Sequence, residues 1–218
     1  SEQDFANQLA AEVEAKLGTR SLGGAWLPAL DDWAAGSARN AATGFLSQFL
    51  GDALMFFSRR EASEQVRREI TESIVKAAAA AAAANGRLVL IGHSMGGGVL
   101  HELLTDPDAI TGMEKQLGRS LKIDAFLSVG TQIGLFAELN LFQVPSSGSS
   151  LAVPVSHYWN IYDYTDTLAF LCGPVVPGVE DLEVNTAAGA IKSHVAYFDN
   201  ALFFHRLNLR LKKAGLVA

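Results

Sequence analysis

The sequence predicts an α/β protein in which a mostly parallel sheet is flanked by helices. Short apolar runs alternate along the chain with longer stretches of helical periodicity, and this alternation is typical of parallel sheets covered on both faces. The chain has 218 residues, of which 49% are hydrophobic and 18% are charged. Because that length and composition support one sizeable core, we expect residues 1–218 to form a single domain.

Four segments are predicted as strands because they are short and rich in apolar residues. They are RLVLIGH at 87–93, KIDAFLSVG at 122–130, HYWNIYD at 157–163 and VEDLEVNT at 179–186. The last of them alternates apolar and acidic residues, which favours a strand near an edge of the sheet.

Helices are predicted before, between and after these strands. The eight alanines at 77–84 mark the end of a long helix that stops at Asn85-Gly86, since alanine is the best helix former and Asn-Gly suits a left-handed cap. Predicted helices cover 2–17, 45–57, 61–84, 95–105 and 195–214. Residues 139–156 are predicted to be either a lid over an apolar pocket or a long connection.

Charge and cysteine content exclude several functions. The net charge is −6 and there is no basic cluster, so nucleic acid is not expected as a partner. Cys172 is the single cysteine, which permits no intrachain disulfide and predicts a small buried side chain. No metal-ligand spacing occurs, and we expect neither a metal nor an organic cofactor. The apolar stretch 123–144 contains polar side chains and is predicted as a buried strand plus a loop, not a membrane span.

The clearest motif is Gly92-His93-Ser94-Met95-Gly96, a match to G-x-S-x-G. It follows a predicted strand and opens a predicted helix, which is the context that this motif requires. We expect side chains at positions 92 and 96 to collide with neighbouring backbone in so tight a turn. The motif therefore predicts Ser94 as a nucleophile, held where a helix N-terminus favours developing negative charge.

The run LVLIGHSMGGGVLHELL at 88–104 resembles the nucleophile elbow of the α/β-hydrolase superfamily, and in particular of its lipase-like and esterase-like members. The resemblance covers about residues 60–210, because later segments keep the family order of strands and loops. It implies the α/β-hydrolase fold and a catalytic triad in the order serine, acid, histidine. It also implies that the backbone N–H of Met95 contributes to the oxyanion hole.

That order places the base after Ser94, and His194 is the favoured candidate because it precedes the last predicted helix. Three other histidines follow Ser94 but lie in predicted helices or before the acid: His101, His157 and His205. His93 adjoins the nucleophile and is expected to point to the other side of the turn. The acid should follow the strand at 157–163, where Asp166 is favoured and Asp163 is the alternative.

The strands that normally precede the elbow in this superfamily are not recognisable. Gly23-Gly24 is a weak candidate for the loop that carries the second oxyanion donor, because it follows a predicted helix. The elbow strand is then expected to expose an unpaired edge, which a missing N-terminal segment or a second copy in a homo-oligomer would complete. A processed chain, a smaller family member and a non-catalytic relative all fit this pattern.

The function expected from these features is a serine hydrolase that cleaves carboxylic esters through an acyl-enzyme, with Ser94, His194 and Asp166 as its triad. The apolar segments 45–57 and 135–144 suggest an acyl-chain pocket and hence a small ester or lipid substrate. The alternative is a binding or scaffold protein on a hydrolase fold with an incomplete oxyanion hole. No signal peptide is recognisable, which favours the cytoplasm without fixing the compartment, since the chain begins at Ser1.

Overall fold

The computed structural model describes residues 56, 60–138, 140–142, 151–152, 154–189 and 192–217. The chain divides into two units, Ser1–Phe56 and Phe57–Ala218, and every helix and strand below lies in the second. The predictions for 2–17, for Gly23-Gly24 and for all of 45–57 except Phe56 lie outside the described residues. Most of 139–156, the segment predicted to be a lid or a long connection, also lies outside the described residues.

Four parallel strands form the sheet in the order β1-β2-β3-β4. They are β1 (Val89–His93), β2 (Ala125–Val129), β3 (Tyr158–Tyr162) and β4 (Val179–Glu183). Each lies inside one of the four predicted segments, so the predicted parallel sheet is confirmed for the described part of the chain. Within that part β1 pairs only with β2, and Ile91 in the middle of β1 is half exposed.

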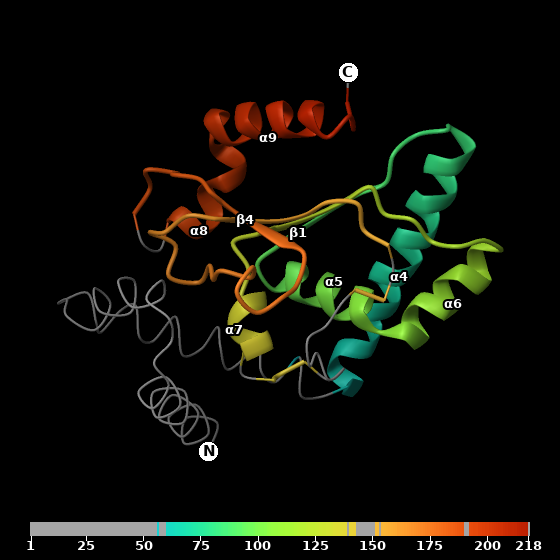
Figure 1. The fold of residues 1–218 in the computed structure, drawn as a ribbon. Helices are drawn as coiled ribbons and strands as arrows, with labels where there is room; N and C mark the ends of the chain where they lie inside the picture. Colours follow the sequence, from blue (N-terminus) through green and yellow to red (C-terminus); the bar gives the residue numbers. More distant parts are fainter. Residues whose placement is uncertain are drawn as a thin grey trace, which may run out of the picture. The chain divides into compact units, whose positions relative to one another are not determined.

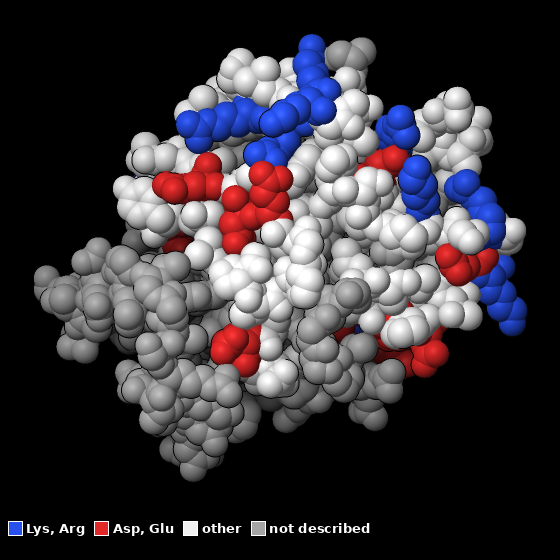
Figure 2. All heavy atoms as spheres, viewed as in Figure 1, with Lys and Arg blue, Asp and Glu red and all other residues white. Residues whose placement is uncertain are grey.

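Helices cover both faces of the sheet, as expected for parallel strands (Figure 1). On one face α5 (Met95–Thr105) packs on β1 and β2, and α4 (Arg60–Ala83) and α6 (Pro107–Leu117) pack on α5. On the other face lies α9 (Ala201–Lys213), the last helix. Lys and Arg side chains gather over α9, above acidic side chains at the β4 edge (Figure 2). The described residues of the second unit therefore form an α/β fold.

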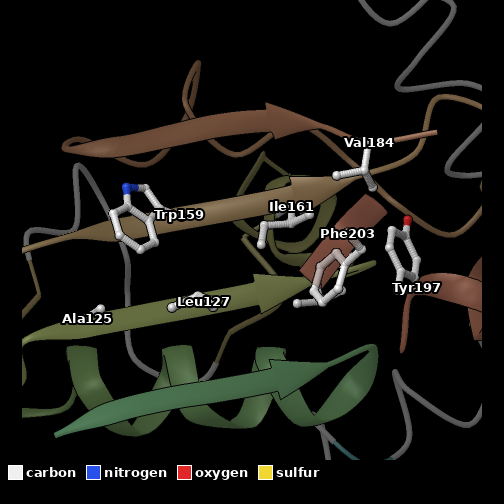
Figure 3. Close-up of a cluster of buried hydrophobic side chains, with 8 residues drawn as sticks. Ala125, Leu127, Trp159, Ile161, Val184, Tyr197 and Phe203 are labelled. Atoms are coloured by element: carbon white, nitrogen blue, oxygen red, sulfur yellow. The ribbon is translucent and has the colours of Figure 1, made fainter. Parts of the chain in front are cut away.

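The main hydrophobic cluster lies between the sheet and α9 (Figure 3). Alternate residues of a strand face opposite sides, and the side chains that face α9 come from odd-numbered positions of β2 and β3. Phe203 of α9 and Tyr197 cover the carboxyl ends of these strands and are almost completely buried. The same cluster therefore stabilises the sheet and anchors the segment that leads into α9.

The predicted end of the alanine-rich helix is confirmed. Asn85 has a left-handed conformation with φ 48°, and the N–H of Gly86 donates to the carbonyl of Ala81 at 2.7 Å. These bonds satisfy carbonyl groups that the helix end leaves without partners. The chain then turns directly into β1, so this cap determines where the strand that leads to Ser94 begins.

Two predictions were wrong in detail. The stretch 123–144 was expected to be a strand plus a loop, but after β2 it forms the short helix α7 (Ile133–Glu138). The single helix expected over 195–214 is divided into α8 (Ser193–Ala196), the 3-10 turn η1 (Tyr197–Asp199) and α9. Asn200 interrupts the helix because its backbone is extended and its side chain accepts hydrogen bonds from the first N–H groups of α9.

Candidate active site

Ser94 is the single residue between the end of β1 and the start of α5. Its backbone angles, φ 53° and ψ −133°, lie in a region that residues other than glycine rarely adopt. Its N–H donates to the carbonyl of Val129 at 3.0 Å, and its carbonyl accepts from the N–H of Gly97 at 3.0 Å. The strained conformation is thus held by hydrogen bonds on both sides, which is typical of functional turns.

Gly92 and Gly97 make this turn possible, whereas the sequence predicted that the two tight positions are Gly92 and Gly96. A Cβ on Gly92 would lie 2.5 Å from the Cα of Gly97, and a Cβ on Gly97 would lie 2.4 Å from the Cγ2 of Thr131. A Cβ on Gly96 would meet no atom of the described residues within 4 Å. The expectation of a collision is therefore confirmed at Gly92 and wrong at Gly96, because the close approach falls one residue later.

A continuous chain of hydrogen bonds joins Ser94, His194 and Asp166. The Oγ of Ser94 lies 2.9 Å from Nε2 of His194, and Nδ1 of His194 lies 3.0 Å from Oδ2 of Asp166. A carboxylate only accepts, so Nδ1 carries the proton and Nε2 accepts from the hydroxyl. The structure brings together the three residues that the sequence favoured as a triad, from the ends of β1 and β3 and from α8.

The turn after β3 aims the carboxylate of Asp166. The N–H of Asp166 donates to the carbonyl of Asp163 at 2.9 Å, and the N–H of Leu168 donates to Oδ1 of Asp166 at 2.9 Å. The phenol of Tyr197 donates to Oδ2 at 2.8 Å. Asp166 is almost completely buried, yet both of its oxygens have partners, as a buried carboxylate requires.

Asp163, the alternative acid, has a different environment. Its Oδ1 accepts from the N–H and hydroxyl of Thr165, and its Oδ2 accepts from those of Thr186, all at 2.6–2.8 Å. Burial favours the neutral acid, but these four hydrogen bonds outweigh it and lower the pKa of Asp163. The structure therefore gives Asp163 a place in the turn that supports Asp166, with its carboxylate bonded to threonines and not to a histidine.

The three remaining histidines after Ser94 lie away from the triad. The ring of His157 stacks on Trp159 at 5.2 Å, and His205 is exposed on α9. His101 is fully buried in α5, where its Nδ1 lies 3.2 Å from the hydroxyl of Tyr158. Among the described residues, its Nε2 has no hydrogen-bond partner. None of these three is placed to accept the proton of Ser94.

Sequence reasoning missed two residues that contact the triad. His93 was expected to point away, but its Nε2 donates to the carbonyl of His194 at 2.7 Å and the two rings lie 4.9 Å apart. The second is Tyr197, whose hydroxyl also accepts from the N–H of Asp163 at 2.9 Å. A side chain on Gly130 would meet Tyr197 at 2.8 Å. A glycine beside the acid turn was the only available signal for this packing.

Met95, whose N–H the sequence predicts as an oxyanion donor, is the first residue of α5 and lies at the helix N-terminus. The candidate for the second donor, Gly23-Gly24, lies outside the described residues. In the described part of the chain no group of three or more His, Cys, Asp or Glu side chains is placed to hold a metal ion. Cys172 is fully buried as predicted, and burial raises the pKa of its thiol.

An open groove of about 400 Å³ runs along β1 and reaches the nucleophile turn. Its lining is mostly apolar, with Ile70 and Ile74 from α4 and Ile91 from β1, and it ends beside His93 and Gly96. The predicted acyl pocket included 135–144, but this groove contains none of those residues. The described aromatic rings of that segment, Phe136 and Phe142, are instead packed in the core.

A comparison of the chain with protein-family models, with curated proteins and with solved structures finds no match.

A search of the described helices for a membrane span finds none that is both long enough and apolar enough.

Proposed function

We propose that this protein is a serine hydrolase of the α/β-hydrolase type that cleaves carboxylic esters. The observation that carries the proposal is the chain of hydrogen bonds from Ser94 through His194 to Asp166. A serine in a strained strand-to-helix turn, bonded to a histidine that is itself bonded to a buried carboxylate, is the arrangement that activates a hydroxyl as a nucleophile. The four parallel strands with helices on both faces agree with this fold type.

In the first half of the reaction, Oγ of Ser94 attacks the ester carbonyl carbon and Nε2 of His194 takes its proton. The carbonyl π electrons move to the oxygen, which accepts a hydrogen bond from the N–H of Met95. Asp166 holds the imidazole with Nδ1–H directed to its carboxylate and stabilises the imidazolium that forms. When the tetrahedral intermediate collapses, the C–O bond to the alcohol breaks and Nε2 returns the proton to the leaving oxygen.

In the second half, water replaces the alcohol. Nε2 of His194 takes a proton from water, whose oxygen attacks the acyl carbon and forms a second tetrahedral intermediate. The bond to Oγ of Ser94 then breaks, and His194 returns the proton to Oγ. The products are a carboxylic acid and regenerated enzyme, and none of these steps needs a cofactor.

The apolar groove beside the turn favours an ester with an apolar group. Its walls come from α4, β1 and α5, and its lining includes His93 and Gly96, on either side of the nucleophile turn, but not Ser94 itself. Small-molecule sites are typically concave and largely apolar with few polar groups. This groove is therefore the part of the described structure that best supports a hydrophobic ester as the substrate.

A fluorophosphonate probe tests the proposal, because it phosphonylates an activated serine. We expect labelling of the wild type and none of Ser94→Ala, with labelling of His194→Ala reduced by at least about a hundredfold. Hydrolysis of p-nitrophenyl esters of increasing acyl length then measures the preference for apolar chains. Well-folded wild-type protein that neither reacts with the probe nor hydrolyses any ester would overturn the proposal in favour of a binding or scaffold protein.

A further inference from the structure

Exposed apolar side chains are concentrated at the C-terminal end of the chain. The described residues expose nine large hydrophobic side chains, and six of these lie between 195 and 217. The six are Val195, Phe198, Leu202, Phe204, Leu209 and Val217. Single exposed apolar residues need no explanation, but a cluster on one segment marks an interaction surface.

The same segment is basic although the protein is acidic, and the sequence expectation that the chain has no basic cluster is wrong here. Residues 201–218 contain four Lys and Arg and no Asp or Glu, so their net charge is +4. The rest of the chain then has 17 − 4 = 13 basic and 23 acidic residues, a net charge of −10. Lys and Arg side chains gather over α9 in the surface view (Figure 2). Such a separation of charge orients the molecule in the field of a charged partner.

Helical spacing puts the apolar and basic residues on one outward face of α9. Positions 202, 205, 206, 209, 212 and 213 follow each other at intervals of three and four residues, which places them on the same side of a helix. We call this set the α9 face, and it consists of Leu202, His205, Arg206, Leu209, Lys212 and Lys213. All six are exposed, whereas Phe203, Leu207 and Leu211 pack toward the sheet.

Acidic residues of β4 lie beside one edge of the α9 face. Arg210, which lies outside the face, pairs with Glu180 at 2.6 Å and stacks over Trp159. Arg206 donates only to the backbone carbonyl of Glu183, at 3.4 Å. Arg206, Leu209 and Lys213 of the face also line a groove of about 520 Å³ together with Glu180, Asp181 and Glu183. The hydrogen bond and charge of Arg210, and to a smaller extent the charge of Lys213, lower the pKa of Glu180, so β4 balances part of the positive charge beside the two exposed leucines.

Aromatic contacts connect the inner side of α9 with the candidate active site. The ring of Phe198 lies 5.6 Å from Phe203 and 5.6 Å from His93, the residue before Ser94. Phe198 is itself 39% exposed and lies four residues before Leu202. Phe198 is therefore a partly exposed apolar side chain that lies in sequence just before the α9 face and contacts the residue before Ser94.

We propose that the α9 face docks on the surface of an anionic lipid bilayer. Exposed leucines flanked by lysine and arginine, on a helix that contains no acid of its own, fit an interface of acyl chains and negative headgroups. A two-fold dimer through this face would bring three cations against three cations, which disfavours a second copy as the occupant. Resting on the proposed function, the substrate esters are then those of bilayer lipids, delivered beside Phe198.

Binding to vesicles tests the proposal without any need for catalysis. Ser94→Ala protein is sedimented with vesicles of phosphatidylcholine alone or of equimolar phosphatidylcholine and phosphatidylserine. We expect binding to the anionic vesicles to be at least about tenfold tighter, since each basic residue near an anionic surface contributes about fivefold. That binding should weaken as salt is raised, because added ions screen exposed charges.

Variants locate the surface. Two variants are made in the Ser94→Ala background. One carries Leu202→Ser and Leu209→Ser, and the other carries Arg206→Gln, Lys212→Gln and Lys213→Gln. Each should weaken binding to anionic vesicles by about tenfold or more. A matched control on α4, Val66→Ser with Arg68→Gln, removes one exposed apolar and one basic side chain elsewhere and should retain binding. Circular dichroism and thermal unfolding establish that each variant is folded.

Three results would overturn the docking surface: no binding to anionic vesicles, equal binding by all folded variants, or sedimentation velocity showing that the α9 substitutions dissociate an oligomer. The last result would assign the face to contact between copies. Failure of the hydrolase proposal looks different, because the fluorophosphonate probe would then leave Ser94 unlabelled while vesicle binding persists. The docking proposal and the hydrolase proposal are therefore tested by separate measurements.

Discussion

The phenol of Tyr197 donates a 2.8 Å hydrogen bond to the same Asp166 oxygen that faces His194. Burial and the adjacent Asp166 carboxylate raise the pKa of Tyr197, so the phenol stays protonated and keeps donating. Its hydroxyl also accepts from the N–H of Asp163. Tyr197 is thus a positioning residue that ties the acid turn to the segment carrying the histidine.

Replacing Tyr197 by phenylalanine tests this relationship. The variant loses a hydrogen bond to a charged group, and we expect kcat/KM for a soluble p-nitrophenyl ester to fall by about tenfold. The carboxylate then holds more negative charge toward His194 and favours the imidazolium. The acidic limb of the kcat/KM profile should therefore move to higher pH, which a purely structural loss would not produce.

Tyr158→Phe is the matched control for that substitution. Tyr158 is also buried and its hydroxyl also lies near a histidine, His101, but it does not contact the triad. We expect its pH profile to coincide with that of the wild type, whatever its effect on stability. If both variants shift the acidic limb equally, Tyr197 has no particular connection to Asp166.

The two aspartates of the acid turn should separate into a catalytic and a structural role. Asp166→Asn removes the acceptor that fixes Nδ1–H of His194, so we expect kcat to fall by about a thousandfold or more with little loss of stability. Asp163→Asn weakens four hydrogen bonds from Thr165 and Thr186, and it should lower the unfolding midpoint in urea. The reverse pattern would transfer the acid role to Asp163.

The lowered pKa of Asp163 also predicts how that loss depends on pH. A carboxylate whose pKa is lower in the folded state stabilises the protein above its unfolded pKa of about 4, and this contribution disappears as pH falls through the folded value. The difference in stability between wild type and Asp163→Asn should therefore shrink in acid. A difference that stays constant down to pH 3 would contradict the assignment.

The backbone strain at Ser94 can be measured by comparing the stabilities of the Ser94→Gly and Ser94→Ala variants. Both substitutions remove the hydroxyl and abolish ester hydrolysis, but only glycine accepts φ 53° and ψ −133° without a steric cost. We expect Ser94→Gly to be more stable than Ser94→Ala by about 1 kcal/mol. At an unstrained position the order is the opposite, so an equal or lower stability of the glycine variant would show that the turn stores no strain.

The glycines around the turn should respond differently to one methyl group. Gly92→Ala places a Cβ 2.5 Å from the Cα of Gly97, a backbone atom that cannot move alone, and we expect a loss of about 1 to 3 kcal/mol. Gly96→Ala enters open space among the described residues at the start of a helix and should be neutral or stabilising by up to about 1 kcal/mol. Urea unfolding of both variants makes the comparison.

Much of this site could be predicted because it follows from chain order and strand geometry. An apolar run followed by glycines and a serine predicts a turn at the carboxyl end of a strand, and parallel strands bring such ends together. Ser94 and the region of the acid turn follow from that rule. The elements that were predicted well, β1 and α5 above all, are those with uninterrupted periodicity and clear end signals.

The residues that were missed depend on contacts between distant segments. The sequence favoured Asp166 over Asp163 as the partner of His194, but it did not predict the threonines that bind the carboxylate of Asp163. Tyr197 lies in a stretch that reads as part of one long helix until Asn200 interrupts it. The space for its ring is left by Gly130, which has φ 59° and comes from a different strand end.

His101 predicts a pH-dependent stability that is independent of the triad. Complete burial lowers the pKa of His101 from 6.5 to about 4, because the charged ring would lose its hydration. Between these two values the unfolded chain binds a proton that the folded protein excludes, so stability contributed by the neutral ring falls as pH falls from 6.5 toward 4.

His101→Gln isolates this contribution, since glutamine does not titrate and its amide oxygen can still accept from Tyr158. Urea unfolding of both proteins from pH 4 to 8 gives the difference in their free energies of unfolding. We expect the free energy of unfolding of the wild type minus that of the variant to increase with pH between about 4 and 6.5 and to be constant above that range. Titrating groups that both proteins share affect both free energies of unfolding and cancel in the difference. A difference that is constant over the whole range would mean that His101 is accessible to protons in the folded state.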